Sequence, residues 1–395
     1  MRAPRASRGS VSGQMSFLEE TRVRFLWALA SVWHRFGRYE QAANMYERIL
    51  RLRPNDKQVI FHRAWWLIEI PHRRKEAIEA LRGLLEGSPY AFGSFLLGNA
   101  LQMEGRDQEA VDAFAEAARL GGPGPPDLYH NWGKSLAILR RREEAAEVLR
   151  QAALLQPSDV DAWRMLGATF IELGQWKDAA ACQERVMRLQ PSVTHGLELG
   201  GTLYELNRLE DAERVLREAL AIDSQSTDAK GLLAMVLSDQ DRHSEAIELA
   251  RQIRAAAPND VPPRLVLGHV LSWAGHFEEA LREANAAAEI APTESRPYSA
   301  LGNIYIRMND GQAAQRSFDC MAACIDPAVE RLPSTDWVWC YAGRGVAFSL
   351  LNRHDEAMVA FEEALRIDGQ IFERCQPYAP HYERSRRATG HADDS

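Results

Sequence analysis

Cysteine and histidine are the side chains of this sequence that could bind a metal or act as nucleophiles. Cys320 and Cys324 lie four residues apart, which on a helix places their Cβ atoms about 6 Å apart, too far for an unstrained disulfide. No third or fourth ligand accompanies them, and the eleven histidines do not cluster at ligand spacing. We interpret the two thiols as core cysteines and predict neither a metal site nor a cofactor.

The segments that carry common catalytic and phosphate-binding chemistry are missing from the sequence. It contains no HExxH, GxxxxGKS, GxxxxGKT, GxSxG or CxxC segment. Gly343 and Gly345 form only a fragment of a glycine motif, inside a predicted helix, where a phosphate loop cannot form. The sequence therefore predicts a protein that is not an enzyme.

Composition bounds the class of protein. The 395 residues are 46% apolar and 26% charged, with a net charge of −8 and a mean hydropathy of −0.35, typical of a soluble folded chain. Five scattered cysteines are not a disulfide framework, so we expect a reducing compartment, the cytoplasm. No run of about 18 apolar residues occurs, so the sequence predicts no integral membrane segment.

Charge is distributed unevenly along the sequence. Residues 1–56 contain ten arginines and five acidic residues, whereas the remainder is strongly acidic. The basic end could steer an acidic partner or form a solvated face, and both interpretations stay open. Nucleic acid is not an expected partner, because the sequence pI is near 5.8 and no basic, aromatic-interleaved motif occurs.

A period of about 34 residues organises the elements that must position these side chains. Proline, alanine and glycine each return at this interval, with alanine replacing some of the glycines. The recurring residues are Pro54, Pro89, Pro123, Pro157, Pro191, Pro258 and Pro292; Ala42, Ala77, Ala110, Ala145, Ala179, Ala212, Ala246, Ala280, Ala314 and Ala357; and Gly98, Gly133, Gly167, Gly200, Gly268, Gly302 and Gly345.

One period shows how these residues specify structure. Over residues 161–193 the apolar residues follow helical spacing, break at Gly174 and stop at Pro191, which predicts two helices of about a dozen residues. Gly167 and Ala179 are small where the two backbones must approach closely. Neither helix can bury its apolar stripe alone, so successive hairpins must stack into a solenoid. Acidic residues placed to cap the following helices are Asp56, Asp159, Asp228 and Asp260.

The pattern formed by Trp163, Leu166, Gly167, Ala179 and Pro191 resembles the tetratricopeptide repeat family. The resemblance covers about residues 23–371 and implies an all-α fold, an α-solenoid with a right-handed superhelix of about ten helical hairpins. We divide the chain into a disordered leader at 1–20, with Met15 as an alternative start, the solenoid at 21–371, and a C-terminal cap with a frayed tail at 372–395. An insertion is expected near residues 327–335.

The resemblance also implies that the first helices of successive hairpins line a concave groove where partner peptides bind. By register, the groove residues of the first five repeats are Trp27, His34, Phe61, Trp65, Trp66, Phe92, Phe95, Asn99, His130, Lys134 and Arg164. The later repeats are more polar there, with Tyr204, Met235, Asp239, His269, Trp273 and Arg307.

Trp65 and Trp66 cannot both face one narrow buried stripe, because neighbours on a helix point about 100° apart. The second repeat has an extra residue near IPHRR, so two registers are possible. In the first register, which we prefer, Ala64 takes the position that glycine or alanine occupies in the first helix of the other repeats. Trp65 and Phe61 then face the groove, and Trp66 lies at the edge of the helix interface. Aligning on Pro89 sends Trp66 into the groove, and a further alternative packs both rings between hairpins.

The sequence predicts a non-enzymatic scaffold or adaptor that binds an extended peptide or helix of a partner protein, mainly through the N-terminal aromatic residues. The lysine and asparagine pattern of the family's chaperone-binding clamp is not met, because Phe95 precedes Asn99 by a turn and His130 precedes Lys134. Two alternatives stay open. One is the regulatory or substrate-recruiting subunit of a multi-chain enzyme. The other is a peripheral membrane assembly factor with an interfacial helix formed by Phe17, Leu18, Arg22, Arg24, Phe25, Leu26 and Trp27.

Overall fold

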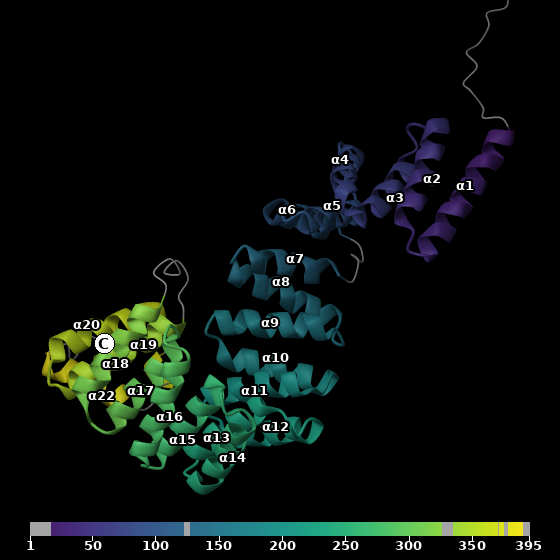
Figure 1. Cartoon of the computed structure of the whole chain (residues 1–395). Coiled ribbons are helices and arrows are strands. Elements are labelled where there is room, and N and C mark those ends of the chain that lie inside the picture. Colours follow the sequence, from purple (N-terminus) through teal and green to yellow (C-terminus); the bar gives the residue numbers. More distant parts are fainter. Residues whose placement is uncertain (1–16, 122–126, 326–334, 370, 375–377, 390–395) are drawn as a thin grey trace, which may run out of the picture. The chain divides into compact units, whose positions relative to one another are not determined.

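The computed structural model describes residues 17–121, 127–325, 335–369, 371–374 and 378–389. Within these ranges the chain is helical and contains no β-strand, which confirms the all-α prediction (Figure 1). The chain divides into two compact units, and each is described by itself: unit 1 spans residues 1–173 and unit 2 spans residues 174–395.

Unit 1 is a succession of helical hairpins. Consecutive helices pack together throughout, and the first helices of neighbouring hairpins, α3, α5, α7 and α9, also touch. This is the packing of a solenoid, in which each hairpin buries its apolar face against its neighbours. The elements are α1 (Phe17–Arg35), α2 (Tyr39–Leu52), α3 (Lys57–Ile68), η1 (Pro71–Arg73), α4 (Arg74–Leu85), α5 (Ala91–Met103), α6 (Asp107–Arg119), α7 (Leu128–Ile138), α8 (Arg142–Leu155) and α9 (Val160–Glu172).

Unit 2 has the same arrangement of hairpins, and its helix α22 packs against α19 and α20, where the sequence places a cap. The first helices α11, α13, α15, α17 and α19 again touch in succession. The elements are α10 (Trp176–Leu189), α11 (Val193–Glu205), α12 (Leu209–Ile222), α13 (Thr227–Asp239), α14 (His243–Ala256), α15 (Val261–Trp273), α16 (Phe277–Ile290), α17 (Ser295–Arg307), α18 (Gly311–Cys324), α19 (Thr335–Leu350), α20 (His354–Ile367), α21 (Ile371–Arg374) and α22 (Ala379–Ala388).

The recurring small residues lie at the closest helix contacts. All ten periodic alanines have no exposed surface, and Ala64 of α3 is equally buried. At Gly98 of α5, an added Cβ atom would lie 2.5 Å from the Phe114 ring of the paired helix α6. The close approach that the sequence predicts is confirmed at this position, because a side chain there would displace the ring.

Two of the four predicted N-caps are confirmed. Asp56 and Asp159 each accept hydrogen bonds from two backbone N–H groups at the start of α3 and α9. The other two are wrong: Ser226 rather than Asp228 caps α13, and Asp260 makes no capping bond at α15. A hydroxyl one residue before the helix satisfies the same free N–H groups as a carboxylate, so residue type alone does not select the cap.

Several boundaries differ from those expected. Helix α1 begins at Phe17, so residues 17–20 are helical rather than part of the leader. Residues 1–16, 326–334 and 390–395 lie outside the described residues, and with them most of the leader, the insertion and the end of the tail. The interpretation of both cysteines of α18 as core residues is wrong, since Cys320 is exposed and Cys324 is half-buried, whereas Cys182 and Cys340 are buried.

Candidate partner-binding surfaces

Unit 1 contains a continuous set of contacting aromatic rings that runs from α1 to α6, which we call the aromatic network. Neighbouring ring centroids lie 3.9–6.4 Å apart, in stacked, tilted and edge-to-face arrangements. Most members are half-buried and keep part of their surface in water. The members are Trp27, His34, Tyr39, Tyr46, Phe61, His62, Trp65, Trp66, Tyr90, Phe92, Phe95 and Phe114.

The adjacent residues Trp65 and Trp66 contact different helices within this network. Trp65 packs edge-on against Phe92 of α5, with ring centroids 5.3 Å apart. Trp66 packs toward α1, where its centroid lies 3.9 Å from that of His34. The two indoles stack at 5.4 Å, both are half-buried, and Ala64 before them is fully buried, as the preferred register requires. Which indole touches a partner stays a prediction.

Two other predicted residues, Phe95 and Asn99 of α5, already make contacts within unit 1. Phe95 is only 5% exposed and packs against Phe114 in the core, so it holds the network in place rather than lining it. Asn99 follows on the same helix, and its Oδ1 accepts a hydrogen bond of 2.9 Å from Asn131 Nδ2 of α7. Its carbonyl oxygen is therefore already engaged by the next repeat.

The three remaining predicted residues lie on later repeats. His130 Nδ1 lies 3.5 Å from Asp159 Oδ2, which orients the imidazole toward the start of α9. Lys134 is exposed. Arg164 is exposed and its guanidinium pairs with Asp161 Oδ1 at 2.9 Å. None of these three belongs to the aromatic network as defined above.

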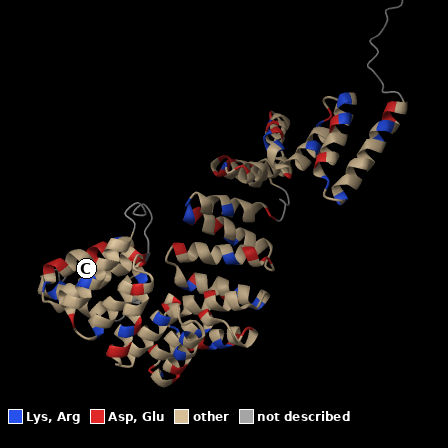
Figure 2. Ribbon diagram, in the orientation of Figure 1, with Lys and Arg blue, Asp and Glu red and all other residues tan. Residues whose placement is uncertain are grey.

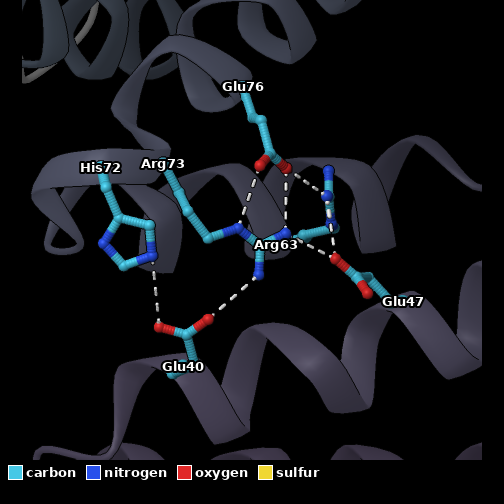
Figure 3. A network of polar contacts seen from close by, with 6 residues as sticks. All are labelled: Glu40, Glu47, Arg63, His72, Arg73 and Glu76. Atoms are coloured by element: carbon cyan, nitrogen blue, oxygen red, sulfur yellow. Dashed lines mark hydrogen bonds and ion pairs between the residues drawn. The ribbon is translucent and has the colours of Figure 1, made fainter.

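A cluster of charged residues joins α2, α3 and α4 beside the aromatic network (Figure 3). We call it the ion-pair network; it comprises Glu40, Glu47, Arg63, His72, Arg73 and Glu76. Arg63 directly precedes the buried Ala64, where most repeats have leucine or tryptophan before the small residue. Its guanidinium lies 3.0 Å from Glu47 and 2.8 Å from Glu76, so the charge is compensated where an apolar side chain would pack.

The arginines of this network favour the ionised form of two carboxylates, those of Glu47 and Glu76. Burial alone would raise the pKa of Glu47, but hydrogen bonds from Arg73 and Arg63 bring it below its ordinary value. The hydrogen bond from Arg73 likewise lowers the pKa of Glu76. These arginines, and Arg53 with its 2.7 Å pair to Glu20, are thus partly neutralised inside unit 1. Figure 2 shows both signs of charge interspersed along the helices of each unit.

His62 is a histidine of the aromatic network that packs between α1 and α2 residues. Its ring centroid lies 4.9 Å from that of Trp27 and 5.9 Å from that of Tyr46. Burial lowers the pKa of His62 below its ordinary value near 6.5, so the folded state favours the neutral imidazole.

Unit 2 contains a cavity of about 730 Å³ lined by residues of α11, α12, α13, α15, α17 and α19, together with Asn207 and Tyr378. Aromatic side chains form much of its wall, including Trp273, Trp339 and Tyr378. A pocket of this size that combines aromatic walls with a few polar groups is the usual form of a binding site for a small molecule or a peptide side chain.

Arg307 is the cation of this cavity. Its guanidinium carbon lies 3.8 Å above the Trp273 ring, and its Nε donates to the carbonyl oxygen of Ser272 at 3.2 Å. Burial lowers the pKa of Arg307, and the nearby Asp239 offsets part of this effect. Within the described residues Arg307 makes no ion pair.

The other polar groups of the cavity are only partly satisfied. Tyr204 donates a 2.7 Å hydrogen bond to Asp239 Oδ2, while Asp239 Oδ1 faces His269 Nε2 at 3.9 Å. Among the described atoms, that oxygen, that nitrogen and Ser272 Oγ are buried without a hydrogen-bond partner. Buried polar atoms of this kind favour a ligand that supplies the missing bonds.

The repeat register predicted five residues of this cavity, Tyr204, Asp239, His269, Trp273 and Arg307, but it did not predict Trp339 and Tyr378. The Tyr378 hydroxyl bonds to Asn303 Oδ1, and its ring lies edge-on to Trp339 with centroids 6.2 Å apart. Tyr378 and Asn303 are 75 residues apart in sequence, and no local pattern links them. Only the folded chain brings these two side chains together.

The described residues show no group of three or more His, Cys, Asp or Glu that could hold a metal ion. No described helix is long and apolar enough to span a membrane. Stacked helical hairpins with small residues at their crossings define the class of helical-repeat proteins. Tetratricopeptide repeat models match residues 26–59, 130–193, 197–261, 237–304 and 340–371, and the chain belongs to the tetratricopeptide repeat family.

Known proteins resemble parts of the chain. The Hsp70-Hsp90 organizing protein of Triticum aestivum is 34% identical over 103 residues, covering 26% of this chain and 17% of that protein. The human protein O-mannosyl-transferase TMTC1 is 25% identical over 202 residues, covering 50% and 22%. The chain thus spans about a fifth of each relative. A tetratricopeptide repeat protein from Parabacteroides merdae superposes with a TM-score of 0.53 at 14% identity, over 68% of this chain and 99% of that one, which shows the fold.

Proposed function

We propose that this protein is a non-enzymatic scaffold that binds an extended peptide or helix of a partner protein. Tetratricopeptide repeat proteins bind protein partners, and the name of the wheat relative describes a protein that organises two others. The proposal assigns two contact surfaces to this chain, the cavity of unit 2 and the aromatic network of unit 1. Cytoplasmic location remains our expectation.

The observation that carries this proposal is the state of Arg307. A half-buried guanidinium stacked on Trp273 and lacking an ion pair in the described structure loses hydration, and the nearby Asp239 offsets this loss only in part. A partner carboxylate would supply it in bidentate form. We therefore infer that the bound segment presents an acidic side chain or a C-terminal carboxylate to Arg307, with its neighbouring residues against the aromatic wall.

The aromatic network is the second contact surface, favoured by its continuity across three repeats and its half-exposed rings. The predicted residues Trp27, Phe61, Trp65, Trp66 and Phe92 form this surface. The interfacial-helix alternative is weakened, because Leu26 is 5% exposed and packs in the core with the half-buried Trp27. Phe17, Leu18 and Phe25 remain exposed on the other face of α1.

Selection of peptides from a random display library against the full chain tests the proposal. We expect the selected peptides to share an acidic residue or a free carboxyl end, and Arg307→Met to weaken their binding at least about tenfold. Arg217→Met, on the outer helix α12, is the matched control and should leave binding unchanged. Equal affinity for both variants contradicts the role of the cavity. Sensitivity to Trp65→Ala alone would move the site to the aromatic network.

A further inference from the structure

Helix α1 has two apolar faces, and the described residues cover only one of them. Val23, Leu26 and Ala30 point into unit 1 and are 3%, 5% and 0% exposed. The other side carries six large apolar residues that are exposed: Phe17 (84%), Leu18 (80%), Phe25 (62%), Val32 (48%), Trp33 (37%) and Phe36 (74%), the last directly after the helix. Contiguous exposed apolar surface of this extent marks a contact site.

The exposed face has the spacing of a coiled-coil seam. Leu18, Arg22, Phe25, Leu29, Val32 and Phe36 follow one another in steps of four, three, four, three and four residues, and we call them the α1 seam. This alternation keeps the six positions on one narrow line along the helix. Arg22 is the single charged residue of the seam, and Figure 2 shows the middle of α1 free of charge.

The position of the α1 seam in unit 1 explains why its side chains are exposed. Each later first helix, α3, α5, α7 or α9, packs against the second helix of the preceding hairpin. No described helix occupies the corresponding side of α1, which lies at the end of the described helices of unit 1 (Figure 1). The stacking interface of the repeats therefore continues onto an open surface, whereas terminal repeats of stable solenoids present a polar outer face.

We propose that the α1 seam binds the α1 seam of a second copy of this chain, with the two helices antiparallel. In the register centred on Trp27, Phe25 faces Leu29 of the partner subunit, and Leu18 faces Phe36 of the partner subunit. Phe25 is 62% exposed and stands out from the helix, whereas Leu29 is half-buried. A protruding side chain thus meets a recessed one on each side of the two-fold axis, as in the knobs-into-holes packing of paired helices.

The charge of Arg22 selects the antiparallel arrangement. In this register Arg22 faces the partner subunit's Val32, with its guanidinium beside the exposed indole of the partner's Trp33, a favourable contact for a cation. A parallel pair in register would instead place two copies of Arg22 against each other, which like charges oppose. The antiparallel seam is therefore self-complementary, as an isologous interface requires.

The exposed area predicts a dimer of moderate affinity. A fully exposed aromatic side chain offers about 200 Å², so the three phenylalanines of this face expose roughly 400 Å² per copy. With the leucines, valine and tryptophan, the interface lies at the lower end of specific protein interfaces. We expect dissociation at low micromolar protein concentration rather than a permanent dimer.

A membrane surface is the other occupant to consider, and the observations favour a second copy. An interfacial helix presents a broad apolar face, whereas the seam is bordered on its outer edge by Thr21, Arg24, Ser31 and Arg35. A flat bilayer surface also makes no use of the fit between the protruding phenylalanine and the recessed leucine. Residues 1–16 lie outside the described ranges, and their sequence offers only Met1, Val11 and Met15 as large apolar residues to cover the seam.

Sedimentation velocity of the full chain over a concentration series tests the proposal. We expect the mass to rise from the 44.4 kDa of one chain toward twice that value. Phe25→Glu should raise the dimer dissociation constant about a hundredfold, since the lost contact occurs twice, and leave the circular dichroism spectrum unchanged. Val359→Glu, at an equally exposed valine of α20 (63%), is the matched control and should still dimerise.

A pair of charge substitutions at the two ends of the seam tests the antiparallel register itself. Leu18→Glu and Phe36→Lys each place a charge against an apolar residue of the other copy, so each should weaken the dimer. In the double variant the antiparallel register brings the two opposite charges together, and the double variant should dimerise more tightly than either single one. A parallel register would bring like charges together and make the double variant the weakest.

Three results overturn the proposal. The first is a chain that stays monomeric at every concentration. The second is a dimer that survives Phe25→Glu, or one that the double charge variant weakens further than either single variant. The third is loss of binding to anionic vesicles in Phe25→Glu while the wild type stays monomeric, which would assign the face to a membrane.

Discussion

Gly302 and Gly268 occupy the same place in adjacent repeats, yet the structure predicts opposite effects of replacing them by alanine. At Gly302 of α17, the new Cβ would lie 2.5 Å from Cζ and 2.6 Å from Cε2 of Phe318. Carbon atoms in contact need about 3.5 Å, so the ring would have to retreat by about 1 Å. Such a movement is restricted, because the ring is fully buried and the backbone of Gly343 of α19 is also close to it: a Cβ atom added there would lie 2.3 Å from the same Cζ atom.

At Gly268 of α15 the space is already sufficient. The nearest atom to an added Cβ is the Ala280 carbonyl oxygen at 3.4 Å, an ordinary contact. The residue facing it, sixteen positions later, is Ala284 instead of phenylalanine. Replacing glycine by alanine inside a helix gains up to about 1 kcal/mol, while overpacking a core costs about 1–3 kcal/mol. Gly268→Ala should therefore stabilise the chain, and Gly302→Ala should lower its unfolding free energy by about 1–2 kcal/mol.

Hydrogen exchange measured by mass spectrometry resolves the two repeats within the full chain. We expect faster exchange in α17 and α18 for Gly302→Ala and slower or unchanged exchange in α15 and α16 for Gly268→Ala. In a Phe318→Ala background the cost of Gly302→Ala should vanish, since the ring that it strikes is gone. If the two single variants are equally stable, or if removing the ring brings no relief, the close-contact explanation is refuted.

Three further predictions follow from unit 1. Trp65→Ala should weaken partner binding at least about tenfold with little change in melting temperature, whereas Trp66→Ala should lower the melting temperature; the reverse result would shift the register by one residue. Glu47→Leu removes one carboxylate partner from both Arg63 and Arg73, which then share Glu76, and should cost about 2 kcal/mol in urea titrations. Arg63→Leu should cost less, because it restores the leucine of other repeats and leaves Glu47 paired with Arg73; equal losses would contradict this account. The folded-state pKa of His62 is lowered, so the unfolded chain binds the proton more tightly than the folded chain does. The stability that this difference gives is present above about pH 6.5 and is lost as the pH falls below that value. Urea midpoints measured at about pH 7 and 5.5 should therefore show a smaller drop for His62→Gln than for the wild type.

The sequence alone determined the repeat and its internal packing. A period of about 34 residues, helical spacing of apolar residues and small residues at fixed positions are local properties, and each hairpin expresses them independently. That is why Ala64, the ten periodic alanines and the contact at Gly98 agree with expectation. The repeat register also predicted most members of the aromatic network, because the first helices of successive hairpins lie side by side.

Only the tertiary structure decided which side chains remain available. Phe95 has the same register as a groove residue, but Phe114 covers it. The wall of the unit-2 cavity requires Tyr378, which reaches Asn303 across 75 residues. Helix α1 is apolar on two faces, and only the packing of α2 decides which face is buried and which carries Phe25 to solvent. Periodicity specifies which face a residue lies on, whereas exposure depends on which neighbour covers that face, and that neighbour is chosen by the folded chain.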